Sequence, residues 1–282
     1  MYILFDIGGT KMRVVAADHE KFLGEPVVVS TPKDFDEGFG TLTRIIDNLA
    51  EKFAPEDRAV TAIVGGIAGP IDADQTMLVN SPNLGGWVGH DIKNALHNIY
   101  KVPVNLENDS AMVGLGETHF GAGRGKSIVV YLTISTGVGG ARFVDGKIDR
   151  SAMGFEPGHQ IIDPDNTLCP TCEGNDLEAY VSGRSIEKRF GVKPYEIHDP
   201  AVWDELAKYL AYGINNTIVY WSPDIVVVGG SMMREVGIPL DAVRKYLAEI
   251  LKIYPNIPPI EKAELGDFGG LYGALALARM HY

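Results

Sequence analysis

Residues Val102–Glu117 read VPVNLENDSAMVGLGE and combine a strand with the start of a helix. The apolar, proline-led part Val102–Leu106 predicts a strand, and Ser110–Glu117 predicts the opening of a helix. Asp109 lies at the turn between them, where a carboxylate can be held rigidly and partly shielded from water. That position suits a general base or a group that orients a hydroxyl. The simpler alternative is that Asp109 or Asn108 caps the helix by accepting hydrogen bonds from its first N–H groups.

Length and charge restrict the class of protein. A chain of 282 residues exceeds the usual size of a single core, which predicts two domains. An apolar content of 45% and a charged content of 22% are ordinary for a globular protein. Asp and Glu outnumber Lys and Arg by 37 to 25, and this net charge of −12 gives no general attraction to nucleic acid or to an anionic membrane surface.

The sequence carries no evident export or membrane signal, so we expect a cytoplasmic protein. No apolar run reaches the roughly 20 residues of a membrane span, and no basic leader precedes the first predicted strand, Tyr2–Phe5. The only two cysteines stand three positions apart, which argues against a disulfide scaffold.

A glycine turn follows the first strand. Two adjacent glycines let the backbone turn tightly and approach a phosphate closely, before the return strand Met12–Ala17. The groups that this turn offers are the backbone of Gly8 and Gly9, the hydroxyl of Thr10, the charge of Lys11 and the carboxylate of Asp6, which could hold hydrated Mg²⁺. An ordinary hairpin turn is the alternative, but such a turn has no need of the Asp, Thr and Lys.

The same strand–glycine–strand pattern recurs later in the chain. Ile128–Ile134 reads as a strand that ends in Ser135–Ala141, STGVGGA, and a third glycine turn at Gly229–Ser231 follows the apolar Val226–Val228. The repetition predicts an internally duplicated architecture in which each half supplies one hairpin that grips phosphate. Two such hairpins could hold the phosphates of a nucleotide.

Two further segments carry polar groups in turns. The first is Ser81–Trp87, SPNLGGW. Asn83 either only stabilises a turn here or, together with Trp87, contacts the hydroxyls and the apolar face of a sugar. Glu156 and His159 could be a plain surface pair, three residues apart. Because the intervening Pro-Gly disfavours regular helix, we expect a loop that presents both side chains to a ligand.

Together these segments resemble the ROK family of sugar kinases and sugar-responsive repressors, which belongs to the actin-like ATPase superfamily. They occur in the family's order and extend over almost the whole chain, to Gly269–Ala274. The segments that carry the resemblance are Asp6–Lys11, Pro82–Trp87, Glu107–Asp109, Ser135–Gly140, Glu156–His159 and Gly229–Ser231.

The resemblance implies an α/β fold of two domains, the actin-like ATPase (ribonuclease H-like) fold, with a cleft between the domains. It places an N-terminal domain at residues 1–110, rejoined by a C-terminal helix at 270–282, and a second domain at 111–269. Homodimers are common in the family, so a homodimer is implied as well.

The resemblance also implies the roles of individual residues. Asp109 would be the base that takes the proton from the attacking sugar hydroxyl. The residues that would bind the sugar are Asn83, Asn108, Glu156, His159 and Glu178. The residues that would serve ATP and its Mg²⁺ are Asp6, Gly8, Gly9, Thr10, Lys11, Thr136, Gly137, Gly229 and Gly230.

Kinases of the family usually carry a three-cysteine zinc cluster after the histidine, and this chain departs from that pattern. A shifted ligand set could still hold structural zinc, with the candidate ligands His159, Cys169, Cys172 and Asp176. The alternatives are that the zinc site has been lost or, less expected, that the two cysteines form a disulfide.

The implied activity is ATP-dependent phosphorylation of a hexose, with glucose first on family frequency. Kinases of N-acetylglucosamine or N-acetylmannosamine are alternatives within the same class. A sugar-sensing regulator without turnover is an alternative of a different class. The net charge of −12, the short segment before Asp6 and the presence of Asp109 all favour the kinase.

Overall fold

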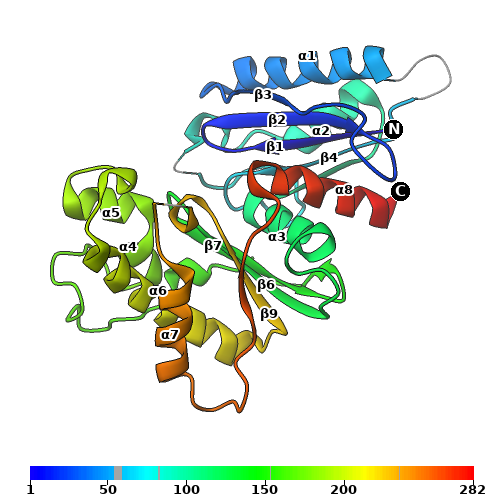
Figure 1. The fold of residues 1–282 in the computed structure, drawn as a ribbon. Coiled ribbons are helices and arrows are strands. Elements are labelled where there is room, and N and C mark those ends of the chain that lie inside the picture. The colour runs from blue at the N-terminus through cyan, green and yellow to red at the C-terminus, as the bar shows by residue number, and fades with distance from the viewer. Residues whose placement is uncertain (54–58, 82, 153, 235) are drawn as a thin grey trace. The chain divides into compact units, whose positions relative to one another are not determined.

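The computed structural model describes residues 1–53, 59–81, 83–152, 154–234 and 236–282. The described chain divides into two compact units (Figure 1). Unit 1 comprises Met1–Phe120 and Leu265–Tyr282, and unit 2 comprises Gly121–Glu264. The division falls after helix α3 (Asp109–Phe120) rather than near residue 110, because α3 packs along helix α8 (Gly269–His281) within unit 1.

Unit 1 is built on a five-stranded sheet in the order β3-β2-β1-β4-β5. Strands β1, β4 and β5 are parallel, whereas β2 and β3 join the sheet antiparallel. Helices α1 and α2 contribute to the core on one face of the sheet, and α3 and α8 to the core on the other. The remaining elements of unit 1 are β1 (Tyr2–Ile7), β2 (Lys11–Ala17), β3 (Val27–Ser30), α1 (Phe35–Phe53), β4 (Ala62–Ile67), the 3₁₀ turn η1 (Gly85–Trp87), α2 (Ile92–Tyr100), β5 (Val104–Asn108) and the 3₁₀ turn η5 (Gly266–Phe268).

Strand β1 shows why its sequence, YILFDI, reads as a nearly continuous apolar run. Every one of its residues is buried, as expected for a parallel strand covered on both faces. Ile3 and Phe5 belong to the core on the side of α1, whereas Tyr2 and Leu4 belong to the core on the side of α8. This alternation is the two-residue period of a strand, so the central strand joins both layers of unit 1.

Unit 2 repeats the strand plan on a second five-stranded sheet, in the order β10-β9-β6-β7-β8. Here β6 and β7 form the antiparallel hairpin, and β9 and β10 continue the sheet parallel to β6. Its elements are β6 (Ile128–Ile134), β7 (Val138–Val144), β8 (Lys147–Ile148), η2 (Pro157–His159), α4 (Leu177–Val181), α5 (Gly183–Phe190), η3 (Pro194–Glu196), α6 (Pro200–Trp221), β9 (Ile225–Gly229), η4 (Ser231–Met233), α7 (Leu240–Ile250) and β10 (Ile260–Lys262).

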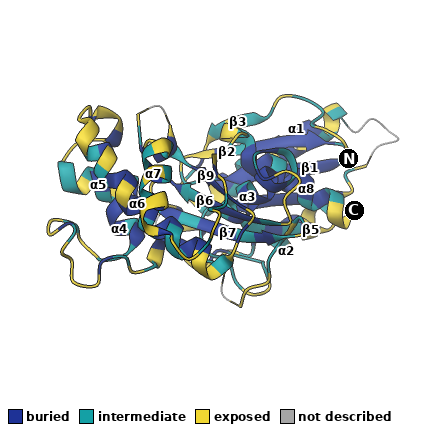
Figure 2. Ribbon diagram, turned by 60° about the horizontal axis from the view of Figure 1, so that its bottom comes forward, coloured by how far each residue is buried: buried dark blue, intermediate teal, exposed yellow. Residues whose placement is uncertain are grey.

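The strands of both sheets are mostly buried, and exposed residues gather on loops and on the outer surfaces of helices (Figure 2). Helix α6 is the longest helix described in unit 2, and its residues Leu206, Leu210 and Ile214, which share one face of the helix, are fully buried. Among the described residues, no helix combines the length and apolar character that crossing a membrane requires.

The predicted strand at Val102–Leu106 lies two residues further along the chain in the structure. Pro103 has no N–H to donate to the sheet, although its carbonyl accepts a hydrogen bond from the Ile63 N–H at 3.0 Å. Strand β5 (Val104–Asn108) begins after this proline and continues to Asn108, which lies opposite Ile67 in the parallel ladder between β4 and β5. The strand therefore continues directly into α3, with no loop between them.

Candidate active site

The carboxyl ends of the parallel strands of unit 1 carry the polar residues that the sequence singles out. Asp6 on β1 lies opposite Gly66 on β4, and Gly66 lies opposite Glu107 on β5. Asn108 is the last residue of β5, and Asp109 is the first of α3. Ligands of open α/β sheets bind at this end of the strands, where helix N-termini and side chains converge.

Asp109 is half-buried and has an acidity suited to proton transfer. Burial and the charge of Asp6 together raise the pKa of the Asp109 carboxyl to about 7, although hydrogen bonds from Ser110 act in the opposite direction. The Ser110 N–H donates to Asp109 Oδ1 at 2.8 Å. A carboxylate with a pKa near neutrality can accept a proton efficiently at physiological pH.

Asn108, rather than Asp109, caps helix α3. Its Oδ1 accepts hydrogen bonds from the N–H groups of Ser110 and Ala111, at 3.0 and 3.1 Å. Its Nδ2 donates to the carbonyl of Gly69 at 2.8 Å. Because a side-chain amide has two N–H groups, these bonds leave one of them for a ligand.

Glu107 stabilises the junction of β5 and α3 through two hydrogen bonds, a role that the sequence does not reveal. One oxygen of its carboxylate accepts from the Asn108 N–H, and the other accepts from Gln75 Nε2, both at 2.8 Å. Burial raises the pKa of Glu107 against the effect of these two bonds. Gln75 has a backbone φ of +54°, a region that residues other than glycine seldom adopt.

Asp6 is buried and paired with Arg13 on the neighbouring strand. Arg13 Nη1 donates to Asp6 Oδ2 at 3.1 Å, across the antiparallel register of β1 and β2. Burial raises the pKa of Asp6 to about 6 in spite of the guanidinium, so the carboxyl remains largely ionised at neutral pH. A Cβ on Gly270 would lie 2.8 Å from Asp6 Cγ, so α8 can approach this carboxylate only through a glycine.

The first glycine turn is a tight hairpin. The Gly8 N–H donates to the Lys11 carbonyl at 2.9 Å, which places Gly9 and Thr10 at the tip. A Cβ on Gly9 would lie 2.5 Å from the Cβ of Asn83, so the glycine allows the loop of Asn83 to pack directly against the turn. The structure thus brings two of the predicted segments of unit 1 into contact.

Trp87 does not have the exposed position that reading a sugar face would require. Its side chain is fully buried in the core of unit 1, and its Nε1 donates to the carbonyl of Pro32 at 2.9 Å. The interpretation of an Asn–Trp rim is therefore wrong for Trp87. Pro82, which the resemblance includes, lies outside the described residues.

In unit 2, the structure brings the other two glycine turns together. Ser135 Oγ and Ser231 Oγ lie 3.0 Å apart, which joins the turn containing Thr136 and Gly137 to the turn at Gly229–Gly230. Gly230 has a φ of +96°, and a Cβ there would lie 2.2 Å from the carbonyl oxygen of Ile134. Only glycine allows this close packing of strand end against strand end.

Glu178 on α4 is bound to the same glycine turn. Its Oε2 accepts a hydrogen bond from the Val138 N–H at 2.7 Å. A Cβ on Gly137 would lie 2.6 Å from that oxygen, so the glycine is what admits the carboxylate. The carboxylate of Glu178 is thereby held in one orientation.

Glu156 precedes the short 3₁₀ turn η2 and His159 is its last residue, so no regular α-helix forms here, as expected from the Pro-Gly between them. His159 Nδ1 lies 2.9 Å from Asp176 Oδ2, and this hydrogen bond, with the charges of Glu178 and Glu156, raises the pKa of His159. Burial raises the pKa of Glu156, which the charge of His159 opposes and that of Glu178 reinforces. The two carboxylates can accept hydrogen bonds from hydroxyls of a ligand, and an N–H of the imidazole can donate one.

The proposed zinc ligands do not assemble. Cys169 and Cys172 form a disulfide, with their Cα atoms 5.4 Å apart, and Asp176 both caps α4 and bonds to His159. Among the described residues, no group of three or more His, Cys, Asp or Glu side chains is arranged to hold a metal ion. Because the thiolates that zinc prefers are consumed in the disulfide, the residues present do not fit a structural zinc site.

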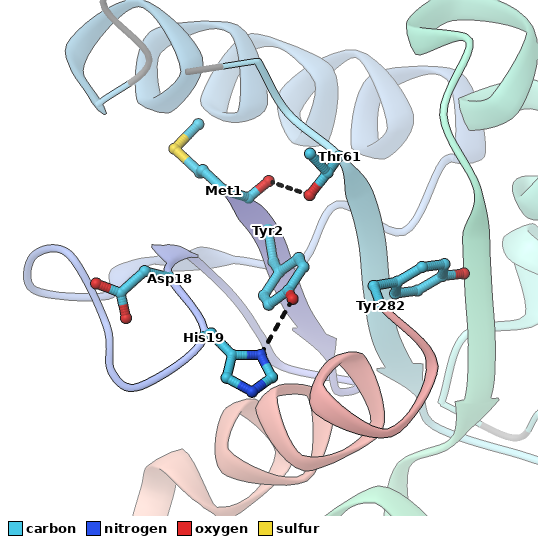
Figure 3. A pocket seen from close by; sticks show the side chains of 6 residues that line it. All are labelled: Met1, Tyr2, Asp18, His19, Thr61 and Tyr282. Atoms are coloured by element: carbon cyan, nitrogen blue, oxygen red, sulfur yellow. Dashed lines mark hydrogen bonds between the residues drawn. The ribbon is translucent and has the colours of Figure 1, made fainter. Parts of the chain in front are cut away.

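A pocket of about 480 Å³ lies at the other end of the sheet of unit 1 and contains none of these groups. Met1, Tyr2 and His19 line it, and the Tyr2 hydroxyl faces the His19 ring (Figure 3). The Tyr2 hydroxyl oxygen and His19 Nδ1 are 3.4 Å apart. Because Tyr2 begins β1 whereas Asp6 lies near its end, we do not assign this pocket to the same chemistry.

The chain is similar to known proteins over nearly its whole length. A model of the ROK family matches residues 2–281. The glucokinase of Streptomyces coelicolor is 28% identical over 97% of this chain and 96% of its own, and the fructokinase of Zymomonas mobilis is 29% identical over 99% and 96%. The crystal structure of a ROK family glucokinase from Streptomyces griseus, in complex with glucose and AMPPNP, matches with a TM-score of 0.79 at 26% identity, over 99% of each chain. The predicted actin-like ATPase fold is confirmed.

Proposed function

The chain belongs to the ROK family, and on this premise we propose that it transfers the γ-phosphoryl group of ATP to a hexose, with glucose as the first candidate. Support comes from family membership and from a glucokinase relative that is similar along nearly its whole length. The observation that carries the proposal is Asp109, a half-buried carboxyl at the junction of β5 and α3 whose pKa is raised to about 7.

Asp109 would act as the general base. Its ionised carboxylate would accept the proton of the sugar hydroxyl as that oxygen attacks the γ-phosphorus, and the bond from the γ-phosphorus to ADP would break. Phosphoryl transfer depends mainly on in-line positioning and charge neutralisation. The protein's task is therefore to hold the acceptor hydroxyl and to remove its proton.

The sugar would be held by groups of two chemical kinds. Asn108 offers one amide N–H next to Asp109, and Asn83 lies against the first glycine turn. Glu156, His159 and Glu178 offer acceptors and, through the imidazole, a donor. Such a mixture suits hydroxyls, each of which can donate one hydrogen bond and accept others.

The nucleotide would be served by the glycine turns of both units. In unit 1 these groups are the turn Gly8–Lys11 and the carboxylate of Asp6, and in unit 2 they are Thr136, Gly137, Gly229 and Gly230. The ionised carboxyl of Asp6 suits hydrated Mg²⁺, which binds to few protein ligands and mainly to water and phosphates. When bound, the ion neutralises phosphate charge.

Other acceptors are possible within the same reaction. The fructokinase relative is as similar as the glucokinase, which makes fructose a second candidate. N-acetylglucosamine and N-acetylmannosamine remain alternatives. A sensor that binds sugar without turnover would have no need of a carboxyl poised for proton transfer.

The test is ADP release with ATP and Mg²⁺ across glucose, mannose, fructose, N-acetylglucosamine and N-acetylmannosamine. We expect turnover above the sugar-free rate with at least one, and glucose to give the highest kcat/KM. A higher kcat/KM with another sugar would overturn the choice of glucose. No turnover, together with thermal stabilisation by one of the sugars, would replace the kinase with the sensor.

A further inference from the structure

Three residues that follow β3, Thr31–Lys33, contact two of the segments to which we have given different roles. We call Thr31–Lys33 the bridge segment. The hydroxyl of Thr31 donates to the carbonyl of Gly8 at 2.8 Å, and its N–H donates to the carbonyl of Thr10 at 3.0 Å. The bridge segment is thus bound to both sides of the first glycine turn.

The side chain of Lys33 connects the first glycine turn to the loop of Asn83. Its Nζ donates to the carbonyl of Gly9 at 2.7 Å and to the carbonyl of Asn83 at 2.9 Å. Gly9 belongs to the turn assigned to nucleotide phosphate, and Asn83 to the loop assigned to sugar. Because an ammonium has three N–H groups, these two bonds leave one N–H and a full positive charge at the junction.

The loop of Asn83 is fitted closely to the bridge segment. The buried Trp87 donates from Nε1 to the carbonyl of Pro32 at 2.9 Å. A Cβ on Gly86 would lie 2.3 Å from the carbonyl oxygen of Lys33, so only glycine admits this approach. The backbone of the bridge segment therefore fixes where the loop lies, whereas the ammonium of Lys33 links the loop to the glycine turn.

We propose that Lys33 is a positioning residue that couples sugar binding at Asn83 to nucleotide binding at the glycine turn Gly8–Lys11. This inference rests on the proposed function. A ligand that orders the loop of Asn83 also orders the carbonyl that Lys33 binds, and through Lys33 it orders the tip of the turn. Coupling of this kind is reciprocal, so the nucleotide must strengthen sugar binding by the same factor.

The experiment measures the dissociation constant of AMPPNP, with Mg²⁺, in the absence and presence of the panel sugar that gives the highest turnover. The variants are Lys33→Met, which keeps the aliphatic chain but removes the charge and its donors, and Lys33→Arg, which keeps both. Lys252→Met is the matched control, because Lys252 is also exposed and donates to one backbone carbonyl, that of Ala248 at 2.7 Å, in the other unit.

For the wild type we expect the sugar to tighten AMPPNP binding about fivefold or more, the lower end of typical coupling between sites. In Lys33→Met this factor should fall below about twofold, while the dissociation constant for the nucleotide alone changes less. Lys33→Arg should restore most of the coupling, and Lys252→Met should behave as the wild type. A structural role alone would lower thermal stability without abolishing the coupling.

The outcomes separate this inference from the proposed function. Wild-type protein that neither binds AMPPNP nor turns over any sugar overturns both. Wild-type turnover without coupling overturns the inference alone, and so does coupling in Lys33→Met equal to that of the wild type.

Discussion

The acidic side chains of the two units differ in the charges that lie beside them. In unit 1, Asp6 and Asp109 lie at strand ends, and burial raises their pKa values to about 6 and about 7. In unit 2, burial also raises the pKa of Glu156, but the charge of the nearby His159 opposes this effect. The pKa of His159 is in turn raised by Asp176, Glu178 and Glu156, so opposite charges lie side by side. A carboxyl that is costly to ionise suits proton transfer, whereas a charge-balanced cluster suits the binding of hydroxyls.

The supports of these side chains differ as well. The residues of unit 1 are positioned by sheet register and by the start of α3, whereas Glu178 and His159 are positioned by single hydrogen bonds, to the Val138 N–H and to Asp176. From this difference we expect substitutions at Asp109 to reduce turnover and substitutions in the unit 2 cluster to weaken sugar binding. The following experiments test this division.

The largest effect is expected from Asp109→Asn. Turnover should fall about 10²–10⁴-fold, because an amide cannot accept the proton, while sugar binding persists. ADP release gives the rate, and sugar-induced thermal stabilisation gives the binding. Asp91→Asn is the control, because Asp91 caps α2 by accepting from the Asn94 N–H and asparagine caps equally well. Near-normal turnover in Asp109→Asn would refute the base assignment.

Glu178→Gln should act mainly on sugar affinity. Glutamine can still accept from the Val138 N–H, but the negative charge beside the imidazole is lost. Hydrogen bonds to charged groups are worth about 1.5–3 kcal/mol, so KM for the sugar should rise about 10–100-fold with a smaller change in kcat. Glu187→Gln, which breaks only an exposed ion pair with Lys193, serves as the control. A fall in kcat with unchanged KM would contradict the division between the units.

The pH profile tests the raised pKa of Asp109. A base must be deprotonated to act, and a raised pKa means that Asp109 becomes protonated as the pH falls through about 7. We therefore expect kcat/KM to be constant above that pH and to decline about tenfold for each pH unit below it. Rates with saturating ATP and limiting sugar measure this limb. A limb near the ordinary pKa of aspartate, about 4, would show that burial does not perturb Asp109 as inferred.

The smallest effect is expected from the disulfide of unit 2. Cys169 and Cys172 enclose a very short loop, so the chain-entropy model gives Cys172→Ser a loss of at most about 2 kcal/mol in the free energy of unfolding. Turnover should stay within about twofold of the wild type, because neither cysteine is assigned to the sugar or the nucleotide. Thermal unfolding, thiol titration and metal analysis of protein purified without chelator provide the measurements. About one equivalent of zinc together with two titratable thiols would contradict the disulfide and support the zinc site predicted from the sequence.

Much of unit 1 could be predicted because its signals are local. The hairpin around Gly8 and Gly9 follows from an apolar run, two glycines and a second apolar run. The position of Asp109 directly after a strand is predictable for the same reason. By contrast, the choice between Asn108 and Asp109 as helix cap depends on side-chain rotamers, which no spacing encodes.

Unit 2 was harder to predict where its residues meet across loops. The spacing of Cys169, Cys172 and Asp176 permitted a metal site, and only the folded loop shows that the two sulfurs are bonded to each other. The prediction that Trp87 in unit 1 contacts a sugar was wrong for a related reason. An aromatic residue in a glycine-rich loop can face either solvent or the core, and Trp87 faces the core.

By itself, the sequence determined the family, the order of the glycine turns and the position of Asp109 after a strand, because these depend on neighbouring residues and on the backbone freedom of glycine. The tertiary structure alone decided which distant groups meet. Lys33 is 24 residues from Gly9 and 50 from Asn83, and no pattern along the chain joins the three. The raised pKa of Asp109 likewise arises from burial and from the charge of Asp6, both of which exist only once the strands have paired.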